Sequence, residues 1–135
     1  SSCLLNSNSI HFLNNDSNDI SESTKNLLKT YFENNIDEDY CLTSSLILEM
    51  YGLREANDVD YLHKDDIKLE NFGLHSGEWL QYYKENKDTI IYSPSNYFYF
   101  NGLKFASLKV IKEMKERRNE KKDKIDLELI KKINI

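Results

Sequence analysis

Residues 44–63, SSLILEMYGLREANDVDYLH, hold the pattern that most limits how this chain can fold. The first half has the apolar spacing of a helix, and Gly52 is suited to close that helix at its C-terminal end. Apolar and acidic residues then alternate over residues 57–63, which predicts a strand with Asp58 and Asp60 on one face. A helix followed so closely by a strand requires a fold in which helices pack against a sheet.

The remaining periodicity predicts a small α+β domain, with a mixed β-sheet flanked by helices. We expect helices over residues 21–35, 44–52 and 76–86, from Ser107 and from about Asp123, and strands over residues 39–45, 57–63 and 88–93. Residues 96–107 predict a hairpin with Asn101-Gly102 as its tight turn. The side chains expected to face inward from the later helices are Trp79, Leu80, Tyr83, Leu108, Ile111, Met114, Ile125, Leu129, Ile130 and Ile133.

The length of 135 residues suits one domain with one modest core. Residues 1–20 are rich in Asn and Ser, which favour turns over helices, so we expect a loosely structured lead-in before a single domain at residues 21–135. The chain starts with neither methionine nor the charged segment of a signal peptide. We therefore expect it to be a fragment of a longer protein.

Charge and cysteine content exclude several classes of function. The net charge is -5, with acids concentrated over residues 16–70 and lysines over residues 104–132. A general nucleic-acid binder would have a dominant basic surface, so nucleic acid is not an expected partner. Two cysteines make no disulfide framework, and no apolar run reaches the roughly 20 residues of a membrane span. These features favour a cytoplasmic location without a membrane span.

Asp58 and Asp60 are the first candidate functional residues. Two residues apart on a strand, their carboxylates point the same way and can converge on one hard cation. Mg²⁺ prefers such oxygen ligands and often bridges to the phosphates of a substrate. The alternative is that Asp58 caps a turn and Asp60 faces solvent, which the three-residue motif alone favours.

The stretch SSLILEMYGLREANDVDYL resembles the signature of the nucleotidyltransferase superfamily that includes DNA polymerase beta. In that family a Gly-Gly or Gly-Ser pair opens a helix, a Gly-x-Arg turn follows, and a strand then carries Asp-x-Asp. Ser44-Ser45, residues 52–54 and residues 58–60 stand at these places. The resemblance implies a nucleotide substrate whose phosphate contacts Ser44 and Ser45, and Mg²⁺ on Asp58 and Asp60.

Residues 102–130 resemble the closing segment of small members of this family. There a K-x-x-R helix leads to a Lys-Asp pair and a later Asp-Leu, and the matching positions are Lys115, Arg118, Lys122, Asp123, Asp126 and Leu127. The resemblance implies that Arg54, Lys115, Arg118 and Lys122 help to bind the nucleotide. It is strongest to domains from bacterial surface-polysaccharide clusters, which implies a cell-surface sugar as a possible acceptor.

Two departures from the family pattern keep a second hypothesis open. Ser44-Ser45 replaces a glycine-containing pair, and the third carboxylate that the family brings from a later strand has no clear match, with Asp88 and Glu70 as candidates. The first hypothesis is a magnesium-dependent transferase of nucleotidyl or phosphoryl groups. The second is a catalytically degenerate module of the same fold that binds a nucleotide or a partner within a larger biosynthetic protein.

Other residues allow functional or structural interpretations. We expect His63 to pack beside the acidic pair, His75 to lie in a loop, and Arg54 to pair with an aspartate of the motif or with a phosphate. A Cys41–His63 nucleophilic pair is conceivable, but a small buried hydrophobe is the favoured role of Cys41. Two groups could be structural or bind substrate: the aromatic cluster Trp79, Tyr82 and Tyr83, and the basic face Lys112, Lys115, Arg118 and Lys122.

Overall fold

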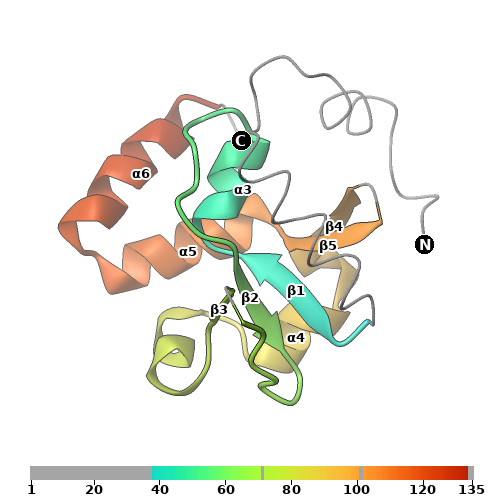
Figure 1. The fold of residues 1–135 in the computed structure, drawn as a ribbon. Coiled ribbons are helices and arrows are strands. Elements are labelled where there is room, and N and C mark those ends of the chain that lie inside the picture. Colours follow the sequence, from blue (N-terminus) through green and yellow to red (C-terminus); the bar gives the residue numbers. More distant parts are fainter. Residues whose placement is uncertain (1–37, 71, 101, 134–135) are drawn as a thin grey trace.

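A computed structural model describes residues 38–70, 72–100 and 102–133 (Figure 1). These residues form a five-stranded mixed sheet with helices, so the predicted α+β class is confirmed at that level. The strands are β1 (Tyr40–Thr43), β2 (Asp60–His63), β3 (Gly73–Leu74), β4 (Tyr97–Phe100) and β5 (Leu103–Ala106). The helices are α3 (Ser45–Met50), α4 (Lys87–Tyr92), α5 (Leu108–Arg118) and α6 (Lys121–Lys131), with 3₁₀ segments η2 (Gly77–Tyr82) and η3 (Pro94–Asn96).

The strand order is β3-β2-β1-β5-β4, which places the two most buried strands, β1 and β5, next to each other. β1 runs antiparallel to β2 and parallel to β5, while β3 runs parallel to β2. In Figure 1, α5 and α6 lie beside each other at one end of the molecule, and α4 lies below the sheet. The sheet therefore mixes parallel and antiparallel pairs, as the sequence predicts.

The helix–turn–strand unit at residues 44–63 forms as predicted. α3 ends at Met50, and Gly52 adopts a positive φ of 72° that lets the chain turn back. The N–H of Gly52 donates to the carbonyl of Glu49, and the N–H of Leu53 donates to the carbonyl of Leu48. These two bonds satisfy the last carbonyls of the helix, which is the usual role of a glycine at this position.

The hairpin at residues 97–106 is also confirmed. β4 and β5 pair antiparallel from Tyr97 opposite Ala106 to Phe100 opposite Leu103. Gly102 has a φ of 84°, which a two-residue hairpin turn requires of its second residue. Asn101, the other predicted turn residue, lies outside the described residues.

α5 begins where predicted, because the hydroxyl of Ser107 accepts the N–H of Val110 as an N-cap. Its predicted inward residues, Leu108, Ile111 and Met114, are all buried. The η2 segment replaces the helix expected over residues 76–86, with Tyr83 buried and Trp79 and Leu80 partly buried.

The predicted strand at residues 88–93 is wrong, because residues 88–92 lie in helix α4 and Ser93 is its C-cap. The side chain of Asn86 accepts the N–H of Thr89 at 2.8 Å and so starts the helix, with Asp88 in the first turn. Ile90 and Ile91 are fully buried. The burial of these two β-branched side chains outweighs their modest preference for strands.

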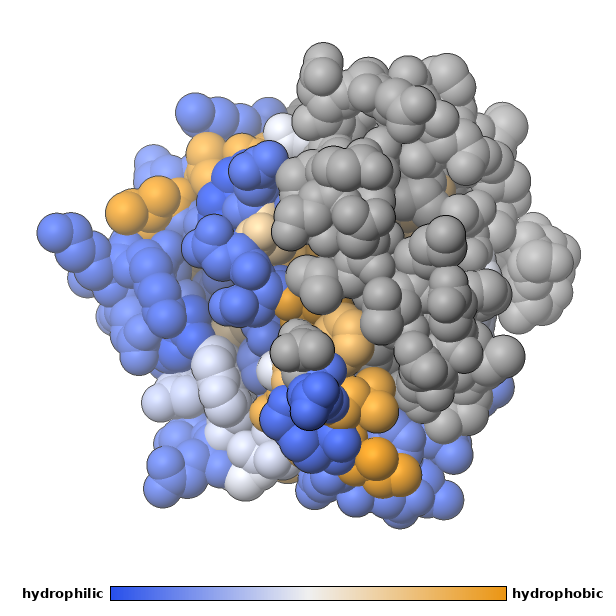
Figure 2. Space-filling view, in the orientation of Figure 1, coloured by the Kyte–Doolittle hydropathy of each residue, from blue (hydrophilic) through white to orange (hydrophobic). Residues whose placement is uncertain are grey.

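The predicted inward face of the last helix is partly wrong. α6 starts at Lys121 rather than near Asp123, and Ile125 is 57% exposed. Ile130 is buried, and Leu129 and Ile133 are partly buried. The inward face also carries two buried carboxylates, Asp123 and Asp126. The surface over α6 is mainly hydrophilic (Figure 2), so this helix contributes few apolar contacts for its length.

The predicted lead-in at residues 1–20 and the helix at residues 21–35 lie outside the described residues. None of the described helices has both the length and the apolar character that crossing a membrane requires. Cys41 is fully buried, and burial raises the pKa of its thiol to about 12. The thiol therefore stays protonated at neutral pH, which fits the favoured role of a small buried hydrophobe and not that of a nucleophile.

Candidate functional site

The antiparallel pairing of β1 with β2 brings the two halves of the sequence motif together. Thr43, the last residue of β1, pairs with Asp60, the first residue of β2. Ser44 and Ser45, which follow Thr43, therefore lie next to Asp58, which precedes β2. Ser44, Ser45, Asp58 and Asp60 line one pocket of about 300 Å³.

The pocket wall contains the eight residues that the sequence analysis assigns to metal or nucleotide binding, which are Ser44, Ser45, Arg54, Asp58, Asp60, Lys115, Arg118 and Lys122. Its wall is formed by Ser44, Ser45, Arg54, Asn57, Asp58, Asp60, Gly73, Leu74, His75, Trp79, Lys115, Arg118, Lys122 and Asp126. The wall thus combines the β1–α3 junction, the start of β2, the β3 strand and the helices α5 and α6. Its volume falls at the lower end of the range for small-molecule sites, about 300–1,000 Å³.

Asp58 and Asp60 form the acidic side of the pocket. The sequence predicts Asp58 and Asp60 within one strand. In the structure β2 starts at Asp60, so Asp58 lies just before the strand. Val59 between them is buried, while both aspartates line the pocket, so the predicted alternation holds. Two pocket-facing carboxylates are suitable ligands for Mg²⁺, which is commonly bound through one or two carboxylates together with water and substrate phosphates.

Gly73 makes room for one of these carboxylates. It lies opposite Asp60 in the parallel β2–β3 pair. A Cβ atom built on Gly73 would overlap Oδ1 of Asp60, so no larger residue fits while this carboxylate keeps its place. A strand as short as β3 shows no alternation of apolar and polar residues, so the role of Gly73 could not be predicted from the sequence.

His75, and not His63, is the histidine beside the acidic pair. Nε2 of His75 lies 3.6 Å from Oδ2 of Asp60, and the imidazole is only 3% exposed. His63 lies at the opposite end of β2, where it pairs with Tyr40 and its Nδ1 accepts the N–H of Asp65. The predicted position of His63 is wrong because three residues of extended chain, about 10 Å, separate it from Asp60.

A chain of buried hydrogen bonds holds His75 in place. Nδ1 of His75 lies 2.7 Å from the hydroxyl of Tyr83, which lies 2.9 Å from the hydroxyl of Thr43. Burial raises the pKa of Tyr83, so its phenol stays protonated and can donate a hydrogen bond. This chain connects β3, the residue after η2 and the end of β1 directly behind the pocket.

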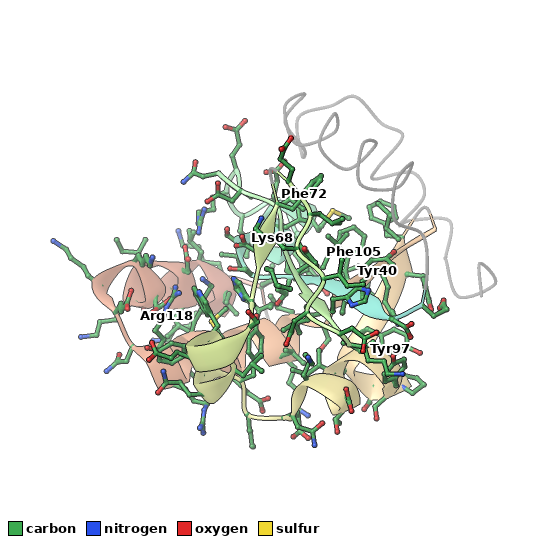
Figure 3. All side chains as sticks on the ribbon, turned by 60° about the horizontal axis from the view of Figure 1, so that its bottom comes forward. Tyr40, Lys68, Phe72, Tyr97, Phe105 and Arg118 are labelled. Atoms are coloured by element: carbon green, nitrogen blue, oxygen red, sulfur yellow. The ribbon has the colours of Figure 1, made fainter. Side chains whose placement is uncertain are left out.

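Trp79 links the acidic side to the basic side. Its indole stacks on His75 with ring centroids 3.9 Å apart and planes 8° apart. The guanidinium of Arg118 lies 4.7 Å from the centroid of the same ring, and Figure 3 shows Arg118 near η2. Protein side chains thus already contact Trp79, which favours a role in the pocket wall over a free platform for a base or sugar.

The basic side comes from α5 and α6. Lys115 is 2% exposed, and its Nζ lies 2.9 Å from Asp126 and 3.8 Å from Asp123. Arg118 donates two hydrogen bonds, of 2.7 and 2.5 Å, to Asp123. Lys122 lines the pocket with a 68% exposed side chain, whereas Lys112, predicted on the same basic face, is not part of this wall.

The two α6 carboxylates remain ionised in this network. Burial alone raises the pKa of Asp126, but hydrogen bonds from Arg54 and Lys115 outweigh burial and hold that pKa below its usual value. The same balance, with hydrogen bonds from Arg118 and from the N–H of Glu120, lowers the pKa of Asp123. Both aspartates therefore act as fixed negative charges that position the basic side chains.

The predicted partner of Arg54 is wrong. Its Nε and Nη2 donate to the two carboxylate oxygens of Asp126 at 2.7 and 2.9 Å, and its Nη1 donates to the carbonyl of Glu55. Arg54 therefore binds an acid of α6 rather than Asp58 or Asp60. The contact is bidentate, as is common for Arg with a carboxylate, and the partner lies 72 residues away in the sequence.

Neither candidate for a third carboxylate reaches the pocket. Asp88 lies in the first turn of α4, and Glu70 is exposed, and neither is part of the pocket wall. Asp126 does line the pocket, but Arg54 and Lys115 hold it. In the part of the chain that the structure describes, no three His, Cys, Asp or Glu side chains converge as a metal site. A cation here would need further ligands from water or from a bound phosphate.

The charges of the pocket wall nearly cancel. Four cationic side chains, Arg54, Lys115, Arg118 and Lys122, face three carboxylates, Asp58, Asp60 and Asp126. One net positive charge attracts a highly charged anion only weakly. A divalent cation on the acidic side would add two positive charges next to the basic side, which suits a metal–polyphosphate ligand better than either component alone.

Ser44 has a backbone conformation that glycine adopts more easily. Its φ of 67° and ψ of -145° place it outside the regions that residues with a side chain prefer. Ser44 is also buried, at the junction between β1 and α3. This strain lies at the family's glycine position, so the serine there is tolerated at a cost in stability.

We predict that Ser44→Gly stabilises the folded chain by about 1 kcal/mol. Relief of backbone strain contributes about 1–3 kcal/mol, and the greater freedom of glycine in the unfolded chain offsets about 0.4–1 kcal/mol of this. Urea denaturation followed by circular dichroism measures the change. Ser45→Gly is the matched control and should lower stability by about 0.5 kcal/mol, because Ser45 lies within α3. A loss of stability in Ser44→Gly would contradict the assignment of strain.

Comparisons with protein-family models, with curated proteins and with solved structures gave no significant match to this chain. The proposals that follow therefore depend on the pocket and on the motif resemblance described above.

Proposed function

We propose that the pocket binds a nucleoside triphosphate together with Mg²⁺, and that the chain is a nucleotidyltransferase-like domain that transfers a nucleotidyl or phosphoryl group. The convergence of two serines and two aspartates across the β1–β2 pair carries this proposal. The family expectation is a phosphate-binding pair before a helix and an Asp-x-Asp on the next strand. The Thr43–Asp60 pairing supports it, because the register puts both parts at one edge of the sheet.

In this proposal one group of pocket residues binds the metal and another group binds the phosphates. Asp58 and Asp60 would hold Mg²⁺, which supplies neutralisation of phosphate charge and alignment of the acceptor hydroxyl. Ser44 and Ser45 would contact phosphate through their hydroxyl groups. Arg118 and Lys122 would add positive charge on the opposite wall.

Lys115 and Arg54 have a different role from the one the resemblance implies. Their hydrogen bonds and ion pairs are directed at the carboxylates of α6, so they anchor this helix to the pocket and shape its basic wall. A phosphate would feel their charge but would compete with Asp126 for direct contact. We therefore assign direct phosphate contact to Arg118 and Lys122 before Lys115 and Arg54.

The acceptor is proposed from the resemblance alone. The similarity of residues 51–63 and 115–123 to domains from bacterial surface-polysaccharide clusters points to a cell-surface sugar as the acceptor. Polysaccharide biosynthesis with activated nucleotides takes place in the cytoplasm, which is the location we propose.

A second candidate function is binding without transfer. β3 pairs with β2 beside Asp60, and it consists of Gly73 and Leu74 followed by His75. This segment therefore has no carboxylate that could act as a base next to Asp60. The third carboxylate of the described pocket wall, Asp126, is held by two cations. This arrangement favours a module that binds a nucleotide or a partner within a larger biosynthetic protein.

We predict that Mg²⁺ and ATP together raise the melting temperature, whereas ATP alone has little effect. At an ATP concentration about 100 times the Kd, binding stabilises the folded state by about 2.7 kcal/mol. Asp58→Asn should abolish the increase, because it removes one of the two proposed metal ligands. Asp65→Asn is the matched control, since Asp65 is exposed and lies outside the pocket wall. An absence of any shift with ATP, GTP, CTP and UTP would contradict the proposed function.

The reaction products distinguish a transferase from a module that only binds its nucleotide. A mixture of the protein, Mg²⁺, γ- or α-labelled nucleotide and a panel of sugar acceptors should release pyrophosphate or nucleoside diphosphate if the domain is a transferase. Nucleotide binding that depends on Asp58, with no turnover of either label, would instead support the binding module.

A further inference from the structure

We propose that Asp60 and His75 together bind the divalent cation of this pocket, so that the site prefers Mn²⁺ to Mg²⁺. The inference rests on the proposed function, because it concerns the cation that accompanies the nucleotide. It replaces the all-carboxylate metal site implied by the family resemblance with a mixed oxygen and nitrogen site.

The separation of the two side chains fits this role. Nε2 of His75 lies 3.6 Å from Oδ2 of Asp60, which is too long for a hydrogen bond. Two atoms that each lie about 2.1 Å from one cation are about 3–4 Å apart. Both residues line the same pocket, and Gly73 leaves the carboxylate of Asp60 free of any side chain from the neighbouring strand.

A hydrogen bond at Nδ1, the ring nitrogen on the side away from Asp60, fixes the orientation of His75. Metal-binding histidines usually have such a bond. Nδ1 of His75 faces the hydroxyl of Tyr83, and that hydroxyl also contacts Thr43. When Tyr83 donates to Thr43, its oxygen accepts the Nδ1–H of His75, and the lone pair of Nε2 then points toward Asp60. A hydrogen bond on the second ring nitrogen is the usual support of a metal-binding imidazole.

Packing fixes the ring as well. Trp79 stacks on the imidazole, which is 3% exposed, so His75 cannot turn away without losing both the stacking contact and the bond to Tyr83. Tyr83 is itself 4% exposed. A buried imidazole held by a dedicated hydrogen bond and aimed at a carboxylate is a preorganised ligand rather than an incidental loop residue.

The donor atoms decide the choice of metal. Mg²⁺ takes oxygen ligands almost exclusively. Mn²⁺ also favours oxygen ligands but, as a first-row transition metal, accepts an imidazole nitrogen more readily than Mg²⁺ does, and the later first-row metals favour that nitrogen more strongly still. Water and the phosphates of a nucleotide would supply further oxygen ligands. The histidine after β3 thus adds a nitrogen ligand beside Asp60, and it changes the metal that the site selects.

The experiment is a titration of the whole chain with Mn²⁺ and, separately, Mg²⁺, each with and without a non-hydrolysable ATP analogue. We expect Mn²⁺ to bind about tenfold more tightly than Mg²⁺, and His75→Gln to remove this advantage. His75→Asp should restore a preference for oxygen ligands and bring the two affinities close together. Tyr83→Phe should weaken Mn²⁺ binding by about tenfold through loss of the supporting bond. His63→Gln, a buried histidine outside the pocket wall, is the control.

A spectroscopic measurement on the unmodified chain avoids dependence on variants that fold poorly. Electron spin echo modulation of bound Mn²⁺ should show ¹⁴N coupling from a coordinated imidazole. Absence of this coupling, or an unchanged Mn²⁺-to-Mg²⁺ ratio in folded His75→Gln, would overturn the inference while leaving nucleotide binding intact. Failure of both cations to bind, with or without nucleotide, would overturn this inference and the proposed function together.

Discussion

Replacing Asp126 with alanine should lower the free energy of unfolding by about 3–5 kcal/mol, the range observed when one partner of a buried ion pair is removed. The carboxylate of Asp126 is 4% exposed and receives hydrogen bonds from Arg54 and an ion pair from Lys115, which is itself 2% exposed. Without Asp126, the ion pairs of Lys115 within the described residues are reduced to the longer, 3.8 Å contact with Asp123. A buried charge with so little compensation is strongly destabilising.

Glu128→Ala is the matched control for this prediction. Glu128 lies on the same helix and pairs with Lys131 at 2.9 Å, but both side chains are largely exposed. Exposed pairs contribute little to stability, so the urea midpoint of this variant should not move. If Asp126→Ala proved as mild as Glu128→Ala, the buried network between α5, α6 and Arg54 would not hold the basic wall in place.

The second large effect is expected from Gly73→Ala. The added methyl group would overlap Oδ1 of Asp60 and force this carboxylate out of its position in the pocket. If Asp60 binds the cation, Mg²⁺-dependent nucleotide binding should weaken by about tenfold or more, which corresponds to about 1.4 kcal/mol or more. Isothermal titration calorimetry with a non-hydrolysable ATP analogue measures the change.

Gly77→Ala separates a binding effect from a general effect on stability. Gly77 has a φ of 58°, so alanine there is strained, yet a Cβ atom would have no neighbour within 4 Å. This variant should lose some stability and keep its nucleotide affinity. Equal affinities for Gly73→Ala and the unmodified chain would show that the position of Asp60 does not matter for binding.

Local patterns were enough to predict the parts of the site that are close in sequence. The turn at Gly52 and the alternation at residues 57–63 place two aspartates together without any knowledge of the rest of the fold. The expected strand at residues 39–45 corresponds to β1, and its antiparallel pairing with β2 then brings Ser44 to the same edge. For this reason the serines and the aspartates line one pocket, and Lys115, Arg118 and Lys122 of the C-terminal helices complete its wall.

Contacts between distant segments were not accessible in the same way. β3 has only two residues and shows no alternation, so the sequence did not reveal that Gly73 pairs with Asp60 and brings His75 to it. The inward-facing Asp123 and Asp126 broke the apolar pattern of α6 and led to the wrong assignment of Ile125 as buried. Tertiary ion pairs, which periodicity does not encode, determine which face of this helix turns inward.

The central claim is that Asp58 and Asp60 hold a cation beside the serines at the β1–α3 junction. A crystal structure of the chain with Mg²⁺ and a non-hydrolysable ATP analogue tests it most directly. We predict a cation bonded to both carboxylates, with phosphate oxygens within hydrogen-bond distance of Ser44 or Ser45 and of Arg118. Phosphates bound elsewhere on the molecule, or a cation that contacts neither aspartate, would contradict it.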